Sequence, residues 1–245
     1  MIYIEKIDLY KPIEPAITFD AWKSVPINEC HQQLVSIDEL VNDRVLFKAE
    51  FNKKGIPGAI KTGYVREQVA DLLLLALKAL PSGYSFLIYD AWRPFSVQKY
   101  LFDNYVKELL KSHVKQEYEI IKMAEEFVSR PSLDKNKPSP HFTGGAVDLT
   151  IIDDQGTTFE IENKYGIESH TRYYEEKLEN GMELSSQEMY YCINRRILYN
   201  SMVSSGFTNY PNEWWHYDFG NQFWGFATKK TAIYGLVEKI SFNRR

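Results

Sequence analysis

Two short stretches of the chain carry side chains that could share one metal ion. The first runs from Ser139 to Asp148 and contains His141, with two glycines before the aspartate. The second contains Glu213 and His216, separated by two tryptophans. Imidazole and carboxylate groups are both zinc ligands, and glycine allows the tight backbone turns that bring distant side chains to one point. Three ligands and one additional carboxylate are the groups that a catalytic zinc site with an open coordination position requires.

We therefore predict that His141, Asp148 and His216 are the metal ligands and that Glu213 is a general base. Zinc with three protein ligands keeps one exchangeable water and can lower the pKa of that water to about 7. Glu213 would take a proton from the metal-bound water and pass it to the leaving amine. In a flat strand, residues three apart face opposite sides, so the hypothesis requires a twist, bulge or turn between Glu213 and His216.

Apolar periodicity predicts several regular elements around these two stretches. Residues 65–80 show apolar side chains at helical spacing and end before Pro81, and residues 84–89 form a β-prone run. Further helices are predicted over residues 95–110, 116–128 and 187–205, and strands over residues 145–152 and 213–217. Residues 132–140 are polar and contain prolines, so they are predicted to be a loop that delivers His141 to the site.

The remaining segments are less regular, and the whole chain, residues 1–245, is predicted to be one α+β domain. Residues 1–60 contain short apolar runs separated by proline and glycine, which indicates short strands and long loops wrapped around a core formed elsewhere. Residues 153–156 are predicted to be a turn, and some helix is expected within 161–182. The sequence shows no internal repeat, low-complexity block or convincing linker.

Composition places the chain among ordinary globular proteins. It has 245 residues, of which 44% are hydrophobic and 25% charged, with a net charge of −4 and no long basic run, so nucleic acid is not an expected partner. No apolar run approaches the roughly 20 residues needed to span a bilayer, and the N-terminus lacks signal-peptide features, so a cytoplasmic location is expected. Cys30 and Cys192 lack metal-ligand spacing and are expected to be separate reduced thiols. Composition does not indicate an oligomeric state.

The two ligand stretches together resemble a known family. The pattern Ser139-x-His141-x-x-Gly144-x-Ala146-x-Asp148 and the later Glu213-Trp214-Trp215-His216 resemble the paired signature of the VanX-type zinc peptidases, the D-alanyl-D-alanine dipeptidases. Residues 90–94 (DAWRP) resemble a third motif of that family, and residues 194–196 (NRR) before residues 206–207 resemble a fourth. The matches follow the order of the family and span roughly residues 65–220, the expected catalytic core.

The resemblance implies a role for each matching position and one Zn²⁺ per chain. It assigns zinc binding to the three predicted ligands, places Glu213 as the catalytic base, and places Arg93 where the family has an arginine that stabilises the developing oxyanion. Ser139 lies where the family has a serine near the substrate. The implied fold is a small antiparallel sheet that carries the zinc, with helices packed against it. The alternative role for Arg93 is a structural ion pair with Asp90.

One stretch departs from the family pattern. Members that cleave the free dipeptide hold its ammonium group with an aspartate in a Gly-x-x-Phe-Asp context, whereas here residues 156–160 read GTTFE. Glu160 is therefore the predicted ammonium contact, with Glu162 behind it. The charge is kept, but the extra methylene displaces the carboxylate, which matters in a site that requires close placement.

The sequence thus predicts a zinc peptidase that hydrolyses D-alanyl-D-alanine or a close D,D-dipeptide to free amino acids. A D,D- or L,D-carboxypeptidase or endopeptidase that acts on longer peptidoglycan stem peptides is the alternative within the same chemistry. A zinc-bearing module that binds cell-wall peptides without catalysis is the alternative of another class. The presence of both Glu213 and Arg93 argues against the last, since neither is needed to hold a metal ion.

Overall fold

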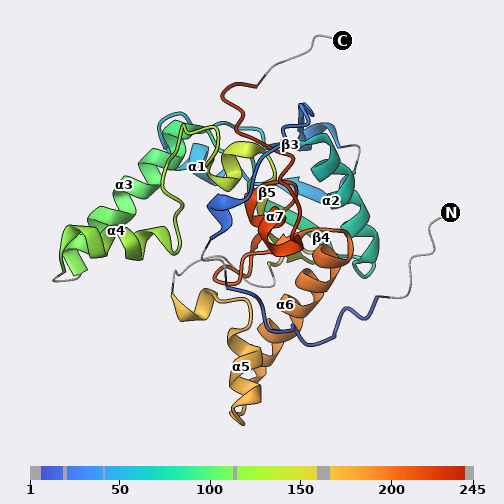
Figure 1. Ribbon diagram of the computed structural model, residues 1–245. Helices are drawn as coiled ribbons and strands as arrows, with labels where there is room; N and C mark the ends of the chain where they lie inside the picture. Colours follow the sequence, from blue (N-terminus) through green and yellow to red (C-terminus); the bar gives the residue numbers. More distant parts are fainter. Residues whose placement is uncertain (1–6, 19–20, 41, 113–114, 159–165, 241–245) are drawn as a thin grey trace.

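The computed structural model describes residues 7–18, 21–40, 42–112, 115–158 and 166–240 (Figure 1). Its centre is a five-stranded sheet with the strand order β2-β4-β5-β7-β6. Strand β2 runs parallel to β4, and the other three neighbouring pairs are antiparallel. The strands are β2 (Val45–Phe47), β4 (Ser85–Asp90), β5 (Ala146–Ile152), β6 (Thr208–Asn209) and β7 (His216–Asp218). The prediction of an α+β fold with a small antiparallel sheet and helices packed against it is confirmed, and the parallel pairing of β2 with β4 is an addition to it.

One face of this sheet forms the main core together with two long helices, α2 (Glu67–Ala79) and α6 (Ser186–Ser204). Along β5 the side chains alternate, and Val147, Leu149 and Ile151 point into the core with α2 and α6. The opposite face of β5 therefore carries Asp148 and is left for the candidate site. Figure 1 shows α2 and α6 lying together on one side of the sheet.

Helix α2 begins two residues later than its apolar pattern predicts. Val65 is buried, but it belongs to a short strand, β3 (Tyr64–Arg66), that pairs with β1 (Leu34–Ser36) in a separate two-stranded sheet. A fully buried strand residue and a buried helix residue give the same local apolar signal, so periodicity could not separate them. The helix ends at Ala79, just before Pro81.

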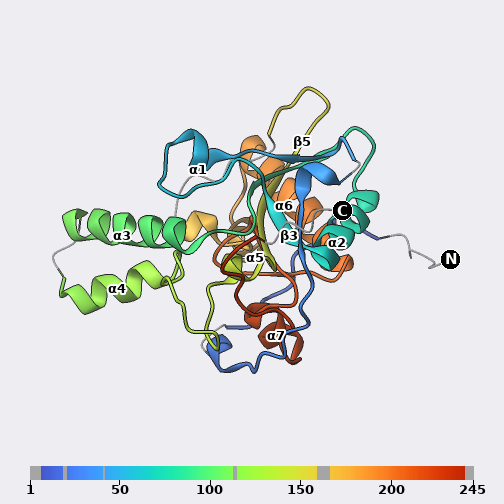
Figure 2. The same cartoon turned by 90° about the horizontal axis from the view of Figure 1, so that it is seen from above.

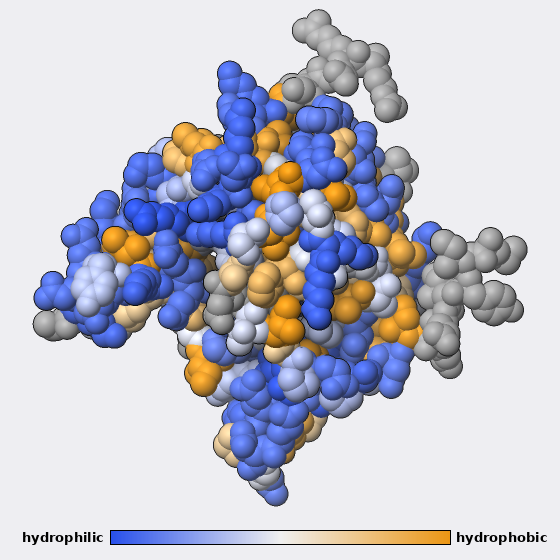
Figure 3. Space-filling view, viewed as in Figure 1, coloured by the Kyte–Doolittle hydropathy of each residue, from blue (hydrophilic) through white to orange (hydrophobic). Residues whose placement is uncertain are grey.

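Helices α3 (Phe95–Ser112) and α4 (Glu117–Glu125) form a hairpin that projects from the body of the protein (Figure 2). The hairpin has its own small apolar cluster, separate from the main core, made by Phe102, Leu109, Ile120, Ala124 and Val128. Hydrophilic residues cover most of its outer surface in the view of Figure 3. The prediction for residues 116–128 was right in type, but α4 ends at Glu125 and the chain after it turns back toward the sheet.

The described residues between 7 and 60 are short elements joined by loops, as predicted, but they contribute to the core instead of only wrapping it. Ile37 and Val45 are buried in the main core, and β2 extends the central sheet. The remaining elements are β1, β3, α1 (Glu50–Lys53), α5 (Tyr173–Glu179), α7 (Gln222–Thr228) and four 3₁₀ turns, Trp22–Ser24, Ile37–Glu39, Pro140–Thr143 and Ile167–Ser169. Neither cysteine forms a disulfide; Cys30 is exposed and Cys192 is buried. Among the helices of the described residues, none is long and apolar enough to cross a membrane.

The packing of α2 against the sheet leads to a prediction about stability. Leu73 is fully buried in the main core, whereas Leu75 on the same helix is 38% exposed. Leu73→Ala should lower the free energy of unfolding by about 2–5 kcal/mol, because it removes buried methyl groups and leaves a cavity. Leu75→Ala, the matched control, should change it by less than about 0.5 kcal/mol. Urea denaturation measures both, and equal effects of the two substitutions would contradict the assignment of the core face.

Candidate active site

Strand register places three candidate side chains next to one another. Asp148 on β5 lies opposite His216 on β7 and opposite Asp90 at the end of β4. Directly opposed residues in a sheet share a face, so these side chains lie on the face away from α2 and α6. Asp90 reaches this face because the register shifts between Ile88 and Asp90, where β4 contributes one extra residue. Without that bulge Asp90 would follow Ile88 into the apolar core.

The second histidine comes from the loop that precedes β5. His141 lies in the 3₁₀ turn Pro140–Thr143, which ends at Gly144 in the left-handed region (φ 73°). A side chain at Gly144 would be strained there and would also meet Leu34 at 2.4 Å. At Gly145 a Cβ atom would lie 2.5 Å from the carbonyl oxygen of Phe219. The two glycines are thus required for the turn that carries His141 over the start of β5.

The three predicted ligands converge on one buried point. His216 Nδ1 is 2.8 Å from Asp148 Oδ1, His141 Nε2 is 3.3 Å from Asp148 Oδ2, and the two ring nitrogens are 3.2 Å apart. All three side chains are buried. Two nitrogen or oxygen ligands, each about 2.0–2.2 Å from a tetrahedral ion, lie about 3.3 Å from each other. The spacing of the three ligand atoms therefore fits a small tetrahedral metal ion, and they form a potential metal site.

Hydrogen bonds on the far side of each ring orient the two histidines. His141 Nδ1 lies 2.9 Å from the carbonyl oxygen of Ala91, so this nitrogen carries the proton and Nε2 is left with its lone pair for a metal. His216 Nε2 lies 3.2 Å from Asp218 Oδ1, a hydrogen bond that likewise leaves Nδ1 facing the site. Asn221 in turn donates to Asp218 Oδ1 at 2.5 Å. Both rings present the nitrogen that metal binding needs.

The electrostatics of the site favour positive charge. Burial alone would raise the pKa of Asp148, but His141 and His216 outweigh it and hold that pKa well below its usual value. Burial opposes the charged form of His216, yet Asp218 and Asp148 raise its pKa well above the ordinary value for histidine. Two buried carboxylates thus stabilise a cation between them. A divalent metal ion held by the same atoms would meet that demand.

Glu213 reaches the site from a turn and not from a strand. Strand β7 starts only at His216, while the amide of Glu213 donates to the carbonyl of Tyr210 and the amide of His216 donates to the carbonyl of Glu213. The prediction of a strand over residues 213–217 was therefore wrong for its first three residues. The turn is the feature that the catalytic hypothesis required, because it brings Glu213 Oε2 to 3.8 Å from His216 Nδ1.

The two tryptophans between these residues belong to the main core. Trp214 and Trp215 are buried and meet at a steep angle, with ring centroids 5.4 Å apart. Arg195 lies over the Trp214 ring, and its guanidinium donates to two backbone carbonyls. The aromatic pair therefore fixes the turn that presents Glu213. Residues 194–196 (NRR) therefore contact this turn through Arg195, which packs on Trp214.

Arg93 lies beside the predicted ligands and makes the ion pair with Asp90 that was the alternative role, while its catalytic role stays a prediction. Its guanidinium is ion-paired with Asp90, and Nη2 is 3.6 Å from Asp148 Oδ2. Nη1 donates to the side-chain oxygen of Gln98 at 2.7 Å. Since Arg93 also lines the same cavity as the ligands, the ion pair with Asp90 orients a guanidinium that faces the site.

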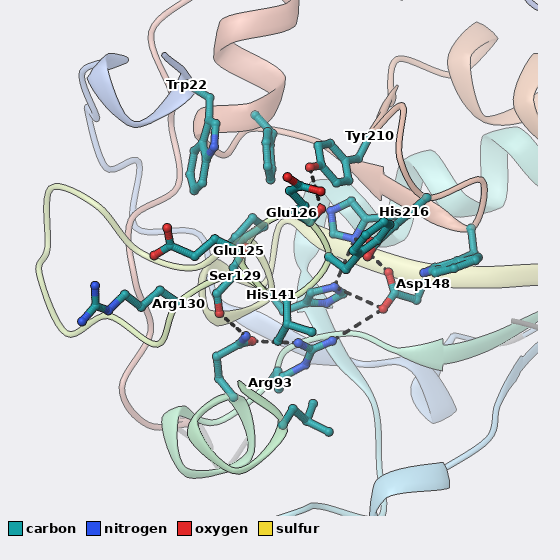
Figure 4. A pocket seen from close by; sticks show the side chains of 18 of the residues that line it. Trp22, Arg93, Glu125, Glu126, Ser129, Arg130, His141, Asp148, Tyr210 and His216 are labelled. Carbon is teal, nitrogen blue, oxygen red and sulfur yellow. Dashed lines mark hydrogen bonds and ion pairs between the residues drawn. The ribbon is translucent and has the colours of Figure 1, made fainter. Parts of the chain in front are cut away.

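These groups line one cavity of about 420 Å³ (Figure 4). Its wall contains the ligands, Glu213 and Arg93, and also residues that sequence patterns did not single out: Trp22, Phe51, Gln98, Tyr210 and Phe223, together with the segment 125–130 that follows α4. Burial, reinforced by Glu213, raises the pKa of Tyr210, so its phenol keeps the proton and donates to the carbonyl of Glu126 at 2.9 Å. Most of these residues belong to no motif. Of the site residues that were missed, only Asp218 had a sequence signal, because it follows His216 by two residues on a strand and so shares its face.

The three residues predicted to contact substrate have different outcomes. The hydroxyl of Ser139 donates to the carbonyl of Arg130 at 3.1 Å, and the side chain is buried, so the structure shows its loop hydrogen bond. A contact between Ser139 and substrate stays a prediction. Glu160 and Glu162 lie outside the described residues.

A carboxylate and a guanidinium that line the same cavity as a potential three-ligand metal site provide the groups of a metallopeptidase. Comparison with known proteins agrees. Residues 47–232 match the family model described as D-ala-D-ala dipeptidase. The chain belongs to this family of metallopeptidases.

The chain is similar to two curated relatives and to two solved structures. A D-alanyl-D-alanine dipeptidase of Synechocystis sp. is 27% identical over 239 residues, which cover 88% of this chain and 96% of that protein. One from Enterococcus faecium is 27% identical over 152 residues, which cover 61% of this chain and 70% of that protein. Among solved structures, a mutant of the vancomycin resistance D,D-pentapeptidase VanY in complex with Zn(II) is 22% identical, with a TM-score of 0.39, over 69% of this chain and 79% of that one. VanYB in complex with D-Alanine-D-Alanine is 20% identical, with a TM-score of 0.38, over 69% of this chain and 81% of that one.

The convergence of the three ligands leads to a prediction about metal content. His141→Ala should abolish stoichiometric zinc binding, because two ligands remain where a stable site needs three. His170→Ala is the matched control, since His170 belongs to no metal group among the described residues. Plasma mass spectrometry of dialysed protein measures zinc per chain. Retention of one zinc by the His141 variant would show that the ion is held elsewhere.

Proposed function

We propose that the protein is a zinc-dependent dipeptidase that hydrolyses D-alanyl-D-alanine, or a close D,D-dipeptide, to free amino acids. The observation that carries this proposal is that His141, Asp148, His216, Glu213 and Arg93 all line a single cavity. Membership of the D-ala-D-ala dipeptidase family supports the substrate class. The cavity, at about 420 Å³, lies in the range of about 300–1,000 Å³ that is typical of small-molecule sites.

His141, Asp148 and His216 would hold the zinc ion. When bound, zinc supplies Lewis acidity, which polarises a carbonyl group and makes water acidic enough to react near neutral pH. The protein side chains supply the remaining parts of the reaction. These side chains are Glu213 and Arg93, which line the same cavity as the three ligands.

Glu213 acts as the general base and then as the general acid. Its carboxylate lies 3.8 Å from the ligand nitrogen of His216 and is nearly buried, so bulk water does not compete for it. It accepts a proton from the attacking water and then donates a proton to the leaving amine as the peptide bond breaks. The turn from Tyr210 to His216 and the tryptophan pair keep the carboxylate in place.

Arg93 stabilises the negative charge that develops on the carbonyl oxygen of the scissile bond. A guanidinium ion-paired with Asp90 is already oriented before substrate arrives, which is the condition for electrostatic stabilisation of a transition state. Asp90 is therefore an orienting group in this mechanism and does not react.

Hydrolysis of D-alanyl-D-alanine by purified protein tests the proposal. We expect release of D-alanine, loss of that activity after chelation, and its return when zinc is added. Free alanine is measured by chromatography, and an L-alanyl-L-alanine sample serves as a stereochemical control.

Two other outcomes would overturn the proposal in different ways. Cleavage of a pentapeptide stem but not of the dipeptide would assign the protein to the carboxypeptidases or endopeptidases of longer stem peptides. A zinc-loaded protein that cleaves neither would indicate a binding module without catalysis.

The role of Glu213 gives a separate prediction. Glu213→Gln preserves the size of the side chain but removes the base, so kcat should fall by about 10²–10⁴-fold while zinc content stays at the wild-type level. Glu117→Gln, on the exposed first turn of α4, is the matched control and should keep full activity. A Glu213→Gln protein with bound zinc and near-normal kcat would exclude Glu213 as the base.

A further inference from the structure

Gln98 is a buried polar side chain of the cavity wall that the proposed mechanism leaves without a role. It lies in the first turn of α3 and is 2% exposed. Its side-chain oxygen accepts a hydrogen bond from Arg93 Nη1 at 2.7 Å, and its side-chain nitrogen donates to the carbonyl of Ser129 at 2.6 Å. Both ends of the amide are thus used.

The chemistry of a glutamine suits this position better than that of a charged residue. Two carboxylates already lie against the Arg93 guanidinium. Asp90 forms an ion pair with it, and Asp148 Oδ2 lies 3.6 Å from Nη2. A third carboxylate would further offset the positive charge that Arg93 offers to the substrate and would itself be costly to bury. The amide oxygen of Gln98 fixes Nη1 without adding charge, and its NH₂ group donates to a backbone carbonyl that a carboxylate would repel.

The other end of the contact belongs to the cavity wall that follows α4. Ser129 lies in the segment 125–130, which lines the same cavity as the ligands. Tyr210 holds the same segment by donating to the carbonyl of Glu126 at 2.9 Å. The projecting α3–α4 hairpin is therefore connected to the site at two points, to Arg93 through Gln98 and to the turn that carries Glu213 through Tyr210.

We propose that Gln98 is a positioning residue that holds the Arg93 guanidinium toward the scissile carbonyl and couples it to the cavity wall at Ser129. The catalytic part of this inference rests on the proposed function, in which Arg93 stabilises the developing oxyanion. The positioning part rests on the two hydrogen bonds alone. Gln98 itself does not touch the reacting atoms in this proposal.

The test compares Gln98→Met with Gln222→Met. Methionine matches the length of glutamine but cannot hold Arg93 or Ser129. Gln222 is also 2% exposed and donates to the backbone carbonyls of Lys23, Val25 and Asn136, so it controls for the loss of a buried amide. Gln98→Met should lower kcat and kcat/KM equally, by about 10–100-fold, because Arg93 acts in the transition state. Zinc content and KM should stay within about two-fold of wild type, and Gln222→Met should keep wild-type kcat.

A double-mutant cycle separates an effect through Arg93 from a general loss of stability. In an Arg93→Lys background, Gln98→Met should lower kcat by no more than about three-fold further, because the guanidinium it positions is gone. Independent effects that multiply would show that Gln98 does not act through Arg93. A rise in KM with unchanged kcat would show that Gln98 only shapes the wall, and either result overturns the proposal.

A second measurement does not depend on catalysis. Hydrogen exchange of the Arg93 guanidinium, followed by NMR in arginine-labelled zinc-loaded protein, should be about ten-fold faster in Gln98→Met and unchanged in Gln222→Met. If wild-type protein cleaves no peptide, the proposed function fails, but this exchange still decides whether Gln98 fixes Arg93. Equal exchange in wild type and Gln98→Met would overturn the positioning role.

Discussion

The burial of the Asp148 carboxylate is the constraint on which the site depends. An isolated charge with 5% exposure would be very costly, so the carboxylate must be surrounded by groups that carry or share positive charge. His141, His216 and Arg93 all approach it within 3.6 Å. Asp218 adds a second buried carboxylate behind His216. The result is a buried cluster of polar groups whose three ligand atoms are spaced for a small cation.

Strand register converts this electrostatic requirement into geometry. Each of β4, β5 and β7 divides its side chains between the apolar core and the site, and Val147 and Tyr217, an opposed pair in the core, alternate with Asp148 and His216 on the other face. The bulge at the end of β4 is the one place where this alternation is broken, and it is what brings Asp90, and with it Arg93, to the site. Packing of the apolar residues on the core face thus fixes the positions of the polar residues on the opposite face of the same strands.

These relations explain how far the sequence could lead. The ligand residues, Glu213 and Arg93 lie in local motifs whose chemistry could be read from residue types and spacing, and the structure brings all five together. Helices α3 and α6 also follow from periodicity and from the signals at their ends. The parallel pairing of β2 and the strand at Val65 could not be predicted, because strand partners depend on contacts between residues that are distant in the chain.

Gln98 and Tyr210 show a second limit, which is physical as well. Each forms a long-range hydrogen bond to a backbone carbonyl, Gln98 to that of Ser129 and Tyr210 to that of Glu126. Every residue type has a backbone carbonyl, so the sequence does not indicate which residue accepts such a bond. Such contacts nevertheless decide how the α3–α4 hairpin is placed. The hairpin buries its own apolar cluster and does not share the main core, so packing alone ties it weakly to the sheet. The two hydrogen bonds join the end of α4 to the two polar groups that the mechanism uses, Arg93 and Glu213. The cavity wall that follows α4 and the groups of the proposed mechanism are therefore joined by these hydrogen bonds, so a change in the hairpin would also affect the placement of Arg93 and of the turn that carries Glu213.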